Sequence, residues 1–196
     1  RQPMRNITLP LHCDQCEQTA HGSVCEINSK PGVCGKDIDV QSLQEMLLYG
    51  LKGMAAYAHH ARRLGKSDEN VSSFIEEALF ATMTNVNFDV PTLLDMCLEC
   101  GRQNLRVMQM LEEGHVESFG DPEPATVQHG TEAGPGILIT GHDLLDLMDL
   151  LRQCEGTDVK VYTHGEMKPG HMYPKLRNHP NLAGHFGTAW QNQKRE

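Results

Sequence analysis

Four cysteines crowd into one short segment near the start of the sequence, HCDQCEQTAHGSVCEINSKPGVCGKD. They are Cys13, Cys16, Cys25 and Cys34. A cluster of this density is typical either of a disulfide framework or of a metal site. Disulfides are rare in reducing compartments, and a chain of 196 residues is long enough to bury a sizeable core without such cross-links. The cysteines therefore predict a metal site.

Nothing in the sequence points away from the cytoplasm. The segment RQPMRNITLPLHC has no long apolar region of the kind a signal peptide needs, and no apolar run approaches the length that spans a bilayer. The formal net charge is −9, whereas phosphate binding depends on clustered lysine and arginine. We therefore expect a cytoplasmic protein with neither a membrane nor a nucleic-acid partner.

The spacing of the four cysteines favours an iron–sulfur cluster over zinc. Cys13 and Cys16 form a Cys-x-x-Cys pair, which can direct two thiolates at one ion or cluster. Eight residues then separate Cys16 from Cys25, and eight more precede Cys34. Structural zinc usually has two close pairs, whereas the four irons of a cubane form a larger body that tolerates this asymmetry. Zinc remains the alternative at this point, and unligated thiols are the third interpretation.

Three amphipathic segments follow the cysteines. Apolar residues recur three or four positions apart in residues 40–65, 67–88 and 89–114, which predicts three helices. The first and third segments end in Gly65 and Gly114, and glycine is common just past a helix C-terminus. Because the connections are short, these helices should form an antiparallel bundle.

The last part of the chain changes character. A polar stretch with proline and glycine leads to GILIT at residues 136–140, whose β-branched residues and flanking glycine predict a strand. The helical pattern HDLLDLMDLLRQCEG follows at 142–156, and a second strand, VKVYT, at 159–163. A strand, a helix and a strand of these lengths form a βαβ unit, with parallel strands and a right-handed crossover.

Two polar side chains follow the two predicted strands. His142 comes just after the first strand, and Glu166 comes just after the second. The carboxyl ends of neighbouring parallel strands meet at one edge of a sheet, where such sheets bind ligands. An imidazole and a carboxylate there would suit a metal or an acid–base pair. The alternative is that His142 caps the following helix and Glu166 is solvated.

Seven stretches of the sequence resemble the hybrid-cluster protein family, also called hydroxylamine reductases. They are CDQCEQTA, GVCGKD, LLYGLKGMAAYAHHARRLG, ALFATMTNVNFD, GILITGHDLLDLMDLL, VYTHGEMKPGHMYP and GTAWQNQKRE. The resemblance implies that the first four cysteines hold a [4Fe-4S] cluster, or a [2Fe-2S] cluster as in some relatives. It also implies that His142 and Glu166 are ligands of a mixed iron–sulfur–oxygen hybrid cluster. Independently of the resemblance, the position of His164 at the same strand end makes it a candidate proton donor.

The function implied by this resemblance is the reduction of hydroxylamine to ammonia and water with two electrons and two protons. Its partners would be a small nitrogenous substrate and an electron-donating reductase or ferredoxin, and a homo-oligomer is compatible with it. Within the family the alternatives are nitric oxide reduction and transfer of nitrosyl groups to protein thiols. From another class, the four cysteines alone also suit a zinc-stabilised helical binding module without turnover.

The sequence departs from the family pattern in two ways. It has room for only one helical bundle, as in the short subclass of the family. The family's remaining hybrid-cluster ligands lie beyond the equivalent of Glu196, so we expect this chain to be the N-terminal part of a longer polypeptide. Cys97, Cys100 and Cys154 occur too early to substitute for those ligands, and the first two are expected to pack inside a helix as small hydrophobes.

The predicted fold class is α/β with an all-α part. Residues 1–38 would form the iron–sulfur segment and residues 39–116 the three-helix antiparallel bundle. Residues 117–196 would form the first part of a Rossmann-like parallel α/β domain that carries the hybrid cluster.

Overall fold

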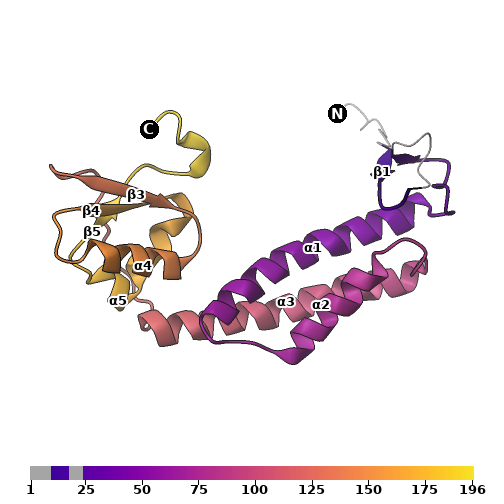
Figure 1. Ribbon diagram of the computed structural model, residues 1–196, viewed down its shortest axis with the longest axis horizontal. Coiled ribbons are helices and arrows are strands. Elements are labelled where there is room, and N and C mark those ends of the chain that lie inside the picture. The colour runs from indigo at the N-terminus through magenta and orange to yellow at the C-terminus, as the bar shows by residue number, and fades with distance from the viewer. Residues whose placement is uncertain (1–9, 18–23) are drawn as a thin grey trace, which may run out of the picture. The chain divides into compact units, whose positions relative to one another are not determined.

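The computed structural model describes residues 10–17 and 24–196 (Figure 1). Contacts divide the chain into two units, one ending at Leu111 and the other running from Glu112 to Glu196. Within the described ranges, no helix combines the length and the apolar character needed to cross a membrane.

The first unit begins with a small antiparallel sheet. Strand β1 spans Leu11–Cys13, strand β2 spans Cys25–Ile27, and Leu11 lies opposite Ile27 in their register. Cys25 and Ile27 are buried whereas Glu26 between them is exposed, as expected for a strand with one covered face.

Helix α1 spans Ile38–Arg63, close to the predicted segment. Asp37 is the N-cap of this helix, and its side chain accepts a hydrogen bond from the backbone N–H of Val40 at 2.9 Å. Beyond the end of the helix, Gly65 adopts a φ of +80°, in the left-handed region that favours glycine.

Helix α2 spans Glu69–Ala81 and is shorter than the predicted segment. Asp68 is its N-cap and accepts a hydrogen bond from Asn70 N at 3.0 Å. The chain leaves the helix at Thr82, and Asn85 then takes a φ of 62°, which no right-handed helix accommodates. The sequence NVNF therefore belongs to a turn.

Helix α3 spans Val90–Phe119, so the predicted end at Gly114 is wrong. Glycine inside a helix costs only about 1 kcal/mol relative to alanine, which packing can outweigh. Here the continuation buries Phe119, whose ring lies 6.0 Å from that of Tyr173. The helix ends instead at Gly120, with a φ of +91°.

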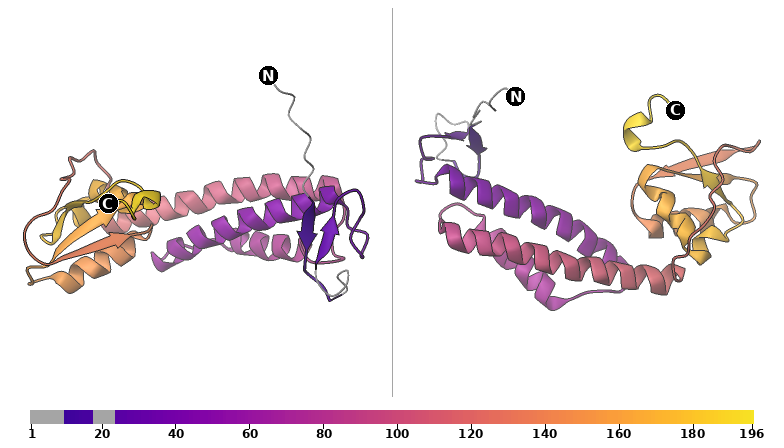
Figure 2. Two further views of the ribbon diagram at one scale, coloured as in Figure 1. Left: turned by 90° about the horizontal axis from the view of Figure 1, so that it is seen from above. Right: turned by 180° about the vertical axis from the view of Figure 1, so that it is seen from behind.

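The three helices lie side by side as an antiparallel bundle (Figures 1 and 2). Its core is formed by residues from all three helices, namely Leu47, Leu51, Met54, Ala61, Val71, Phe74, Ala78, Cys100, Val107 and Met110. Burying this apolar face is what stabilises the helices, as the amphipathic pattern predicted.

The second unit contains a parallel three-stranded sheet. Strands β3 (Gly136–Thr140), β4 (Lys160–His164) and β5 (Leu182–His185) are neighbours in that order. Helix α4 (Leu144–Cys154) connects β3 to β4, which confirms the predicted βαβ unit.

The connection from β4 to β5 is less regular. It contains a 3-10 helix, η2, at Gly165–Met172, and a short helix, α5, at Pro174–Arg177. A second 3-10 turn, η3, follows β5 at Trp190–Asn192. Strand β4 is the buried centre of the sheet, whereas most residues of β3 are exposed.

Candidate functional site

The four clustered cysteines line a single cavity in the first unit. Its walls are Cys13, Cys16, Cys25, Ile27, Gly32, Val33, Cys34, Lys36 and Thr84. No three His, Cys, Asp or Glu side chains in the described ranges are arranged to hold one metal ion. The four thiols instead border one small common space.

The backbone places the cysteines around this cavity. Cys13 and Cys25 are partners in the register of β1 and β2. Cys34 lies in a turn in which Gly35 N donates to Gly32 O at 2.9 Å. Gly35 has a φ of +87°, so a residue with a side chain would be strained there.

Hydrogen bonds connect the cysteine segment to the helical bundle. Gln15 lies between Cys13 and Cys16, and its Nε2 donates to Thr82 O at 2.8 Å. Thr84, in the turn after α2, donates its hydroxyl to Gln15 Oε1 at 2.9 Å. The turn after α2 therefore forms part of the cavity wall and also holds the Cys-x-x-Cys loop.

Lys36 is the residue of this site that sequence reasoning missed. Its side chain is fully buried, and its Nζ lies 3.6 Å from Cys13 Sγ. A lysine between Gly35 and Asp37 is expected from the sequence to lie in solvent. Its closeness to Cys34 in the sequence is the one signal that could have indicated a place in the site. No carboxylate is among the described residues that line the cavity.

This donor set fits an iron–sulfur group. Thiolates are soft ligands that select zinc or iron–sulfur clusters, and a buried ammonium beside them supplies charge compensation. Both features are present at the cavity, where the thiols surround a space and Lys36 faces one of them.

The second predicted site lies at the carboxyl edge of the parallel sheet. Thr140 and His164 end neighbouring strands and are partners in their register. His142 and Glu166 follow directly, and His142 Nε2 lies 3.9 Å from Glu166 Oε2. The structure thus brings the two side chains together, and both remain about two-thirds exposed, at 66% and 65%.

The helix-capping alternative for His142 is wrong. The N-cap of α4 is Asp143, whose Oδ1 accepts hydrogen bonds from Leu145 N at 2.8 Å and Asp146 N at 3.4 Å. Glu166 is solvated, as that alternative held, but it faces His142. An imidazole nitrogen and a carboxylate oxygen in this arrangement can bind one metal ion or cluster from the same side.

His164 lies under this edge and is almost completely buried. Its Nδ1 is 3.4 Å from Thr140 Oγ1, and its Nε2 is 3.1 Å from Glu196 Oε2. Glu196 also accepts hydrogen bonds from the backbone N–H and the hydroxyl of Thr188. The Thr188 hydroxyl, followed by His164, holds the pKa of the Glu196 carboxyl below its usual range.

A buried polar group behind the sheet edge was also missed. Thr163 Oγ1 lies 2.9 Å from both His171 Nε2 and His185 Nδ1. Burial, followed by the positive charge of Lys168, lowers the pKa of His185 to about 4. Burial likewise lowers the pKa of His171. These residues come from separate elements, so no local sequence motif announced them.

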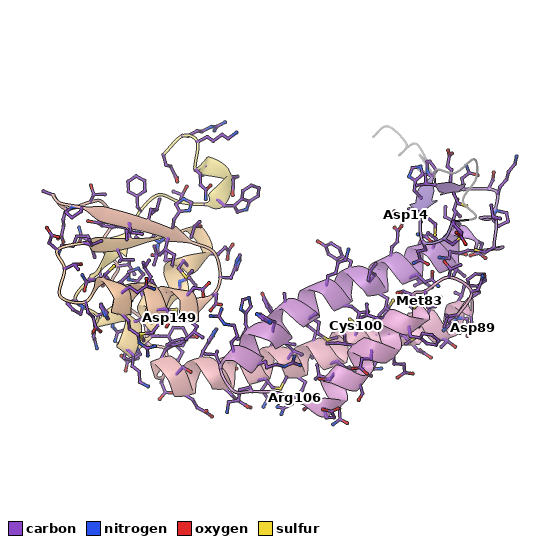
Figure 3. All side chains as sticks on the ribbon, viewed as in Figure 1. Asp14, Met83, Asp89, Cys100, Arg106 and Asp149 are labelled. Carbon is purple, nitrogen blue, oxygen red and sulfur yellow. The ribbon has the colours of Figure 1, made fainter. Side chains whose placement is uncertain are left out.

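The second Cys-x-x-Cys pair packs as predicted. Cys100 belongs to the bundle core (Figure 3), and Cys97 Sγ lies 3.6 Å from Leu43 O. Burial raises the pKa of both thiols, which disfavours the thiolate that binds metal. Cys154 is buried in α4.

Comparison of the sequence with known proteins gives consistent results. The Prismane/CO dehydrogenase family matches residues 11–96 and 89–196. A hydroxylamine reductase of Moorella thermoacetica is 58% identical over 186 residues, which is 95% of this chain and 43% of the relative. A hydroxylamine reductase of Thermotoga maritima is 48% identical over 187 residues, with the same shares. The chain thus spans less than half the length of these relatives.

Comparison of the structure supports the fold. Carbon monoxide dehydrogenase IV from Carboxydothermus hydrogenoformans aligns with a TM-score of 0.73 and 15% identity. The alignment covers 98% of this chain and 45% of the dehydrogenase. At this identity the similarity concerns the fold alone.

Proposed function

The chain belongs to the Prismane/CO dehydrogenase family, and from this premise we propose that it is part of an iron–sulfur oxidoreductase that reduces hydroxylamine. The reaction is NH2OH + 2e− + 2H+ → NH3 + H2O, in which the N–O bond breaks. The observation that carries the proposal is the cavity that all four clustered cysteines line. The similarity to two hydroxylamine reductases over 95% of the chain supports the choice of substrate.

We propose that Cys13, Cys16, Cys25 and Cys34 hold a [4Fe-4S] cluster in this cavity. When bound, such a cluster supplies one-electron transfer. The chain's own contribution is to present four thiols from one small sheet and two loops, and to exclude water with the buried side chain of Ile27. Gln15 then holds the Cys-x-x-Cys loop against the turn after α2.

His142 and Glu166 are proposed as two ligands of the hybrid cluster in the second unit. Their 3.9 Å separation and their exposure at one sheet edge leave both donor atoms accessible. Further ligands would come from a longer polypeptide, since the hydroxylamine reductases above extend over more than twice this length. His164 is a candidate proton donor, because it is buried next to this edge and hydrogen-bonded to Glu196.

The remaining parts of the proposal follow from the chemistry. Reduction of hydroxylamine requires an external source of single electrons, so the partner would be a reductase or a ferredoxin. We propose a cytoplasmic location because such thiols must stay reduced to bind iron. A homo-oligomer is compatible with this arrangement.

The first test measures iron, acid-labile sulfide and zinc per chain after anaerobic purification, with an absorption spectrum before and after dithionite. About four iron and four sulfide per chain, with bleaching on reduction, are expected for the cubane. The Cys25→Ser variant should lose most of the iron, whereas Cys97→Ser should keep it because Cys97 lies in the bundle. About one zinc with no chromophore would instead establish the helical binding module.

A second test addresses the sheet-edge site in a polypeptide of the relatives' full length. Glu166→Gln should abolish hydroxylamine reduction and leave the iron of the four-cysteine cavity in place. The matched control is Glu155→Gln, an exposed position just past α4 that lies outside the proposed site. Unchanged turnover in Glu166→Gln would remove that residue from the active site.

A further inference from the structure

Lys36 has a position that is costly for a lysine. Its side chain has no exposed surface, and its Nζ lies at the wall of the cysteine cavity, 3.6 Å from Cys13 Sγ. Lysine is almost never fully buried unless it is paired, because removing an ammonium group from water is unfavourable. The burial therefore calls for a counter-charge.

The described residues around the cavity supply no carboxylate for this purpose. The neighbouring Asp37 is exposed, and its side chain accepts a hydrogen bond from Val40 N at the start of α1. The groups that remain are the cysteine sulfurs, which become thiolates when they bind metal. Lys36 Nζ already has hydrogen-bond geometry to one of them.

The turn that carries Cys34 also fixes Lys36. Lys36 O accepts a hydrogen bond from Gly32 N at 2.8 Å, and Gly32 O accepts one from Gly35 N at 2.9 Å. These bonds close the segment between Gly32 and Lys36, so a proposed ligand and the ammonium group share one small rigid turn. The backbone of Lys36 is thereby fixed relative to Cys34, and its side chain reaches Cys13 in β1.

We propose that Lys36 is a positioning residue that raises the reduction potential of the cluster held by the four cysteines, by donating to the Cys13 thiolate. This inference rests on the proposed iron–sulfur function. Reduction adds one negative charge to the cavity. A fixed positive charge in a buried site of low dielectric stabilises the reduced form more than the oxidised form. Hydrogen bonds to cluster sulfurs act in the same direction and are a recognised determinant of the potential.

The test compares three variants of the 196-residue chain, each loaded anaerobically with ferrous iron and sulfide. Lys36→Met keeps an unbranched side chain only one atom shorter and removes the charge, whereas Lys36→Arg keeps the charge. Lys30→Met is the matched control, because Lys30 is exposed in the same segment and water screens its charge. The readouts are iron and sulfide content and the midpoint potential from a dithionite titration.

The Lys36→Met substitution should shift the equilibrium between oxidised and reduced cluster at least tenfold towards the oxidised form. For a one-electron couple this lowers the midpoint potential by about 59 mV. Lys36→Arg and Lys30→Met should stay close to the wild-type potential. Equal potentials in Lys36→Met and the wild type, at full iron content, would overturn the inference.

Two further outcomes separate this inference from the function on which it rests. If the Lys36→Met variant binds no iron, the Lys36→Gln variant is used in its place for the potential measurement. Its amide keeps an N–H donor but carries no charge. A lower potential in Lys36→Gln than in Lys36→Arg supports the inference, and equal potentials overturn it. A wild-type chain that takes up no iron would overturn the proposed cluster itself, and the role of Lys36 with it.

Discussion

Cys13 lies directly opposite Cys25 across the two strands β1 and β2. Opposite residues of an antiparallel pair direct their side chains to the same face, with Cα atoms about 4.5–5.5 Å apart. Backbone pairing therefore brings two of the four thiols together before any metal binds. Much of the ordering that a metal site requires is thus part of the fold, which lowers the entropic cost of binding.

The same strand pairing makes Ile27 a critical residue for the cavity. Ile27 is fully buried, faces the same side of β2 as Cys25 and lines the cavity. We expect Ile27→Ala to lower the free energy of unfolding of the first unit by about 2–4 kcal/mol and to reduce iron uptake. Urea unfolding and iron content measure the two effects. Glu26→Ala, on the exposed face of the same strand, should change neither by much, and equal effects of both substitutions would argue against this account.

Gln15 is expected to stabilise the Cys-x-x-Cys loop rather than to bind metal. Gln15→Ala removes hydrogen bonds to Thr82 and Thr84, which together contribute about 1–2 kcal/mol. The loaded variant should start with full iron content and release iron to a chelator faster than the wild type. Thr84→Val should show part of the effect and Thr84→Ser little of it, since serine keeps the hydroxyl group. Identical release rates for all four proteins would refute the role of these bonds.

Asp143 should contribute to the second unit through its capping of α4. Asp143→Ala removes the acceptor for Leu145 N and Asp146 N, and loss of such a cap costs about 1 kcal/mol. Asp143→Asn should retain most of the stability because the amide oxygen also accepts these bonds. Urea unfolding of the three proteins tests this expectation. An alanine variant as stable as the wild type would show that the helix start is fixed by other contacts.

The histidines behind the sheet edge predict a loss of stability in acid. Unfolded histidine has a pKa near 6.5, whereas the pKa of folded His185 is about 4. Between these values the unfolded state binds a proton that the folded state excludes. The stabilising contribution is therefore complete above about pH 6.5 and falls towards pH 4, by at most about 1.4 kcal/mol per pH unit.

The measurement for this prediction is urea unfolding at a series of pH values. His185→Gln removes the titrating group and should flatten the pH dependence between 6.5 and 4. The burial-lowered pKa of His171 should leave a residual slope in that variant. A wild-type chain whose stability stays constant over this range would contradict the buried neutral state of both rings.

The sequence was sufficient for the regular elements whose local signals agree with their packing. The apolar periodicity of residues 40–65 predicted α1, and the alternation of strand and helix patterns predicted the order of β3, α4 and β4. Strand β5 was missed because it is short and contains Gly184. A side chain at Gly184 would clash with the Gln128 carbonyl oxygen, so only glycine fits at this position. Glycine inside a strand weakens the sequence pattern by which a strand is predicted.

The candidate sites show a similar division. The four cysteines were identified from their residue type and spacing in the sequence. His142 and Glu166 were identified because each follows a predicted strand. The burial of Lys36 depends on how the Cys34 turn folds back onto β1, and the contacts of Thr163 depend on residues from three elements. Neither arrangement has a local pattern, so only the three-dimensional structure shows it.

The position of the cysteine cavity along the chain has a consequence for biosynthesis. Thr84 is the last described residue that lines it, and the bundle core beneath it is complete at Met110. Domains generally fold as units during translation, with N-terminal ones first. The cavity can therefore form while the ribosome has yet to synthesise β5 (Leu182–His185), the last strand of the parallel sheet. Iron delivery to this cavity can then start on the nascent polypeptide, ahead of the sheet that carries His142 and Glu166.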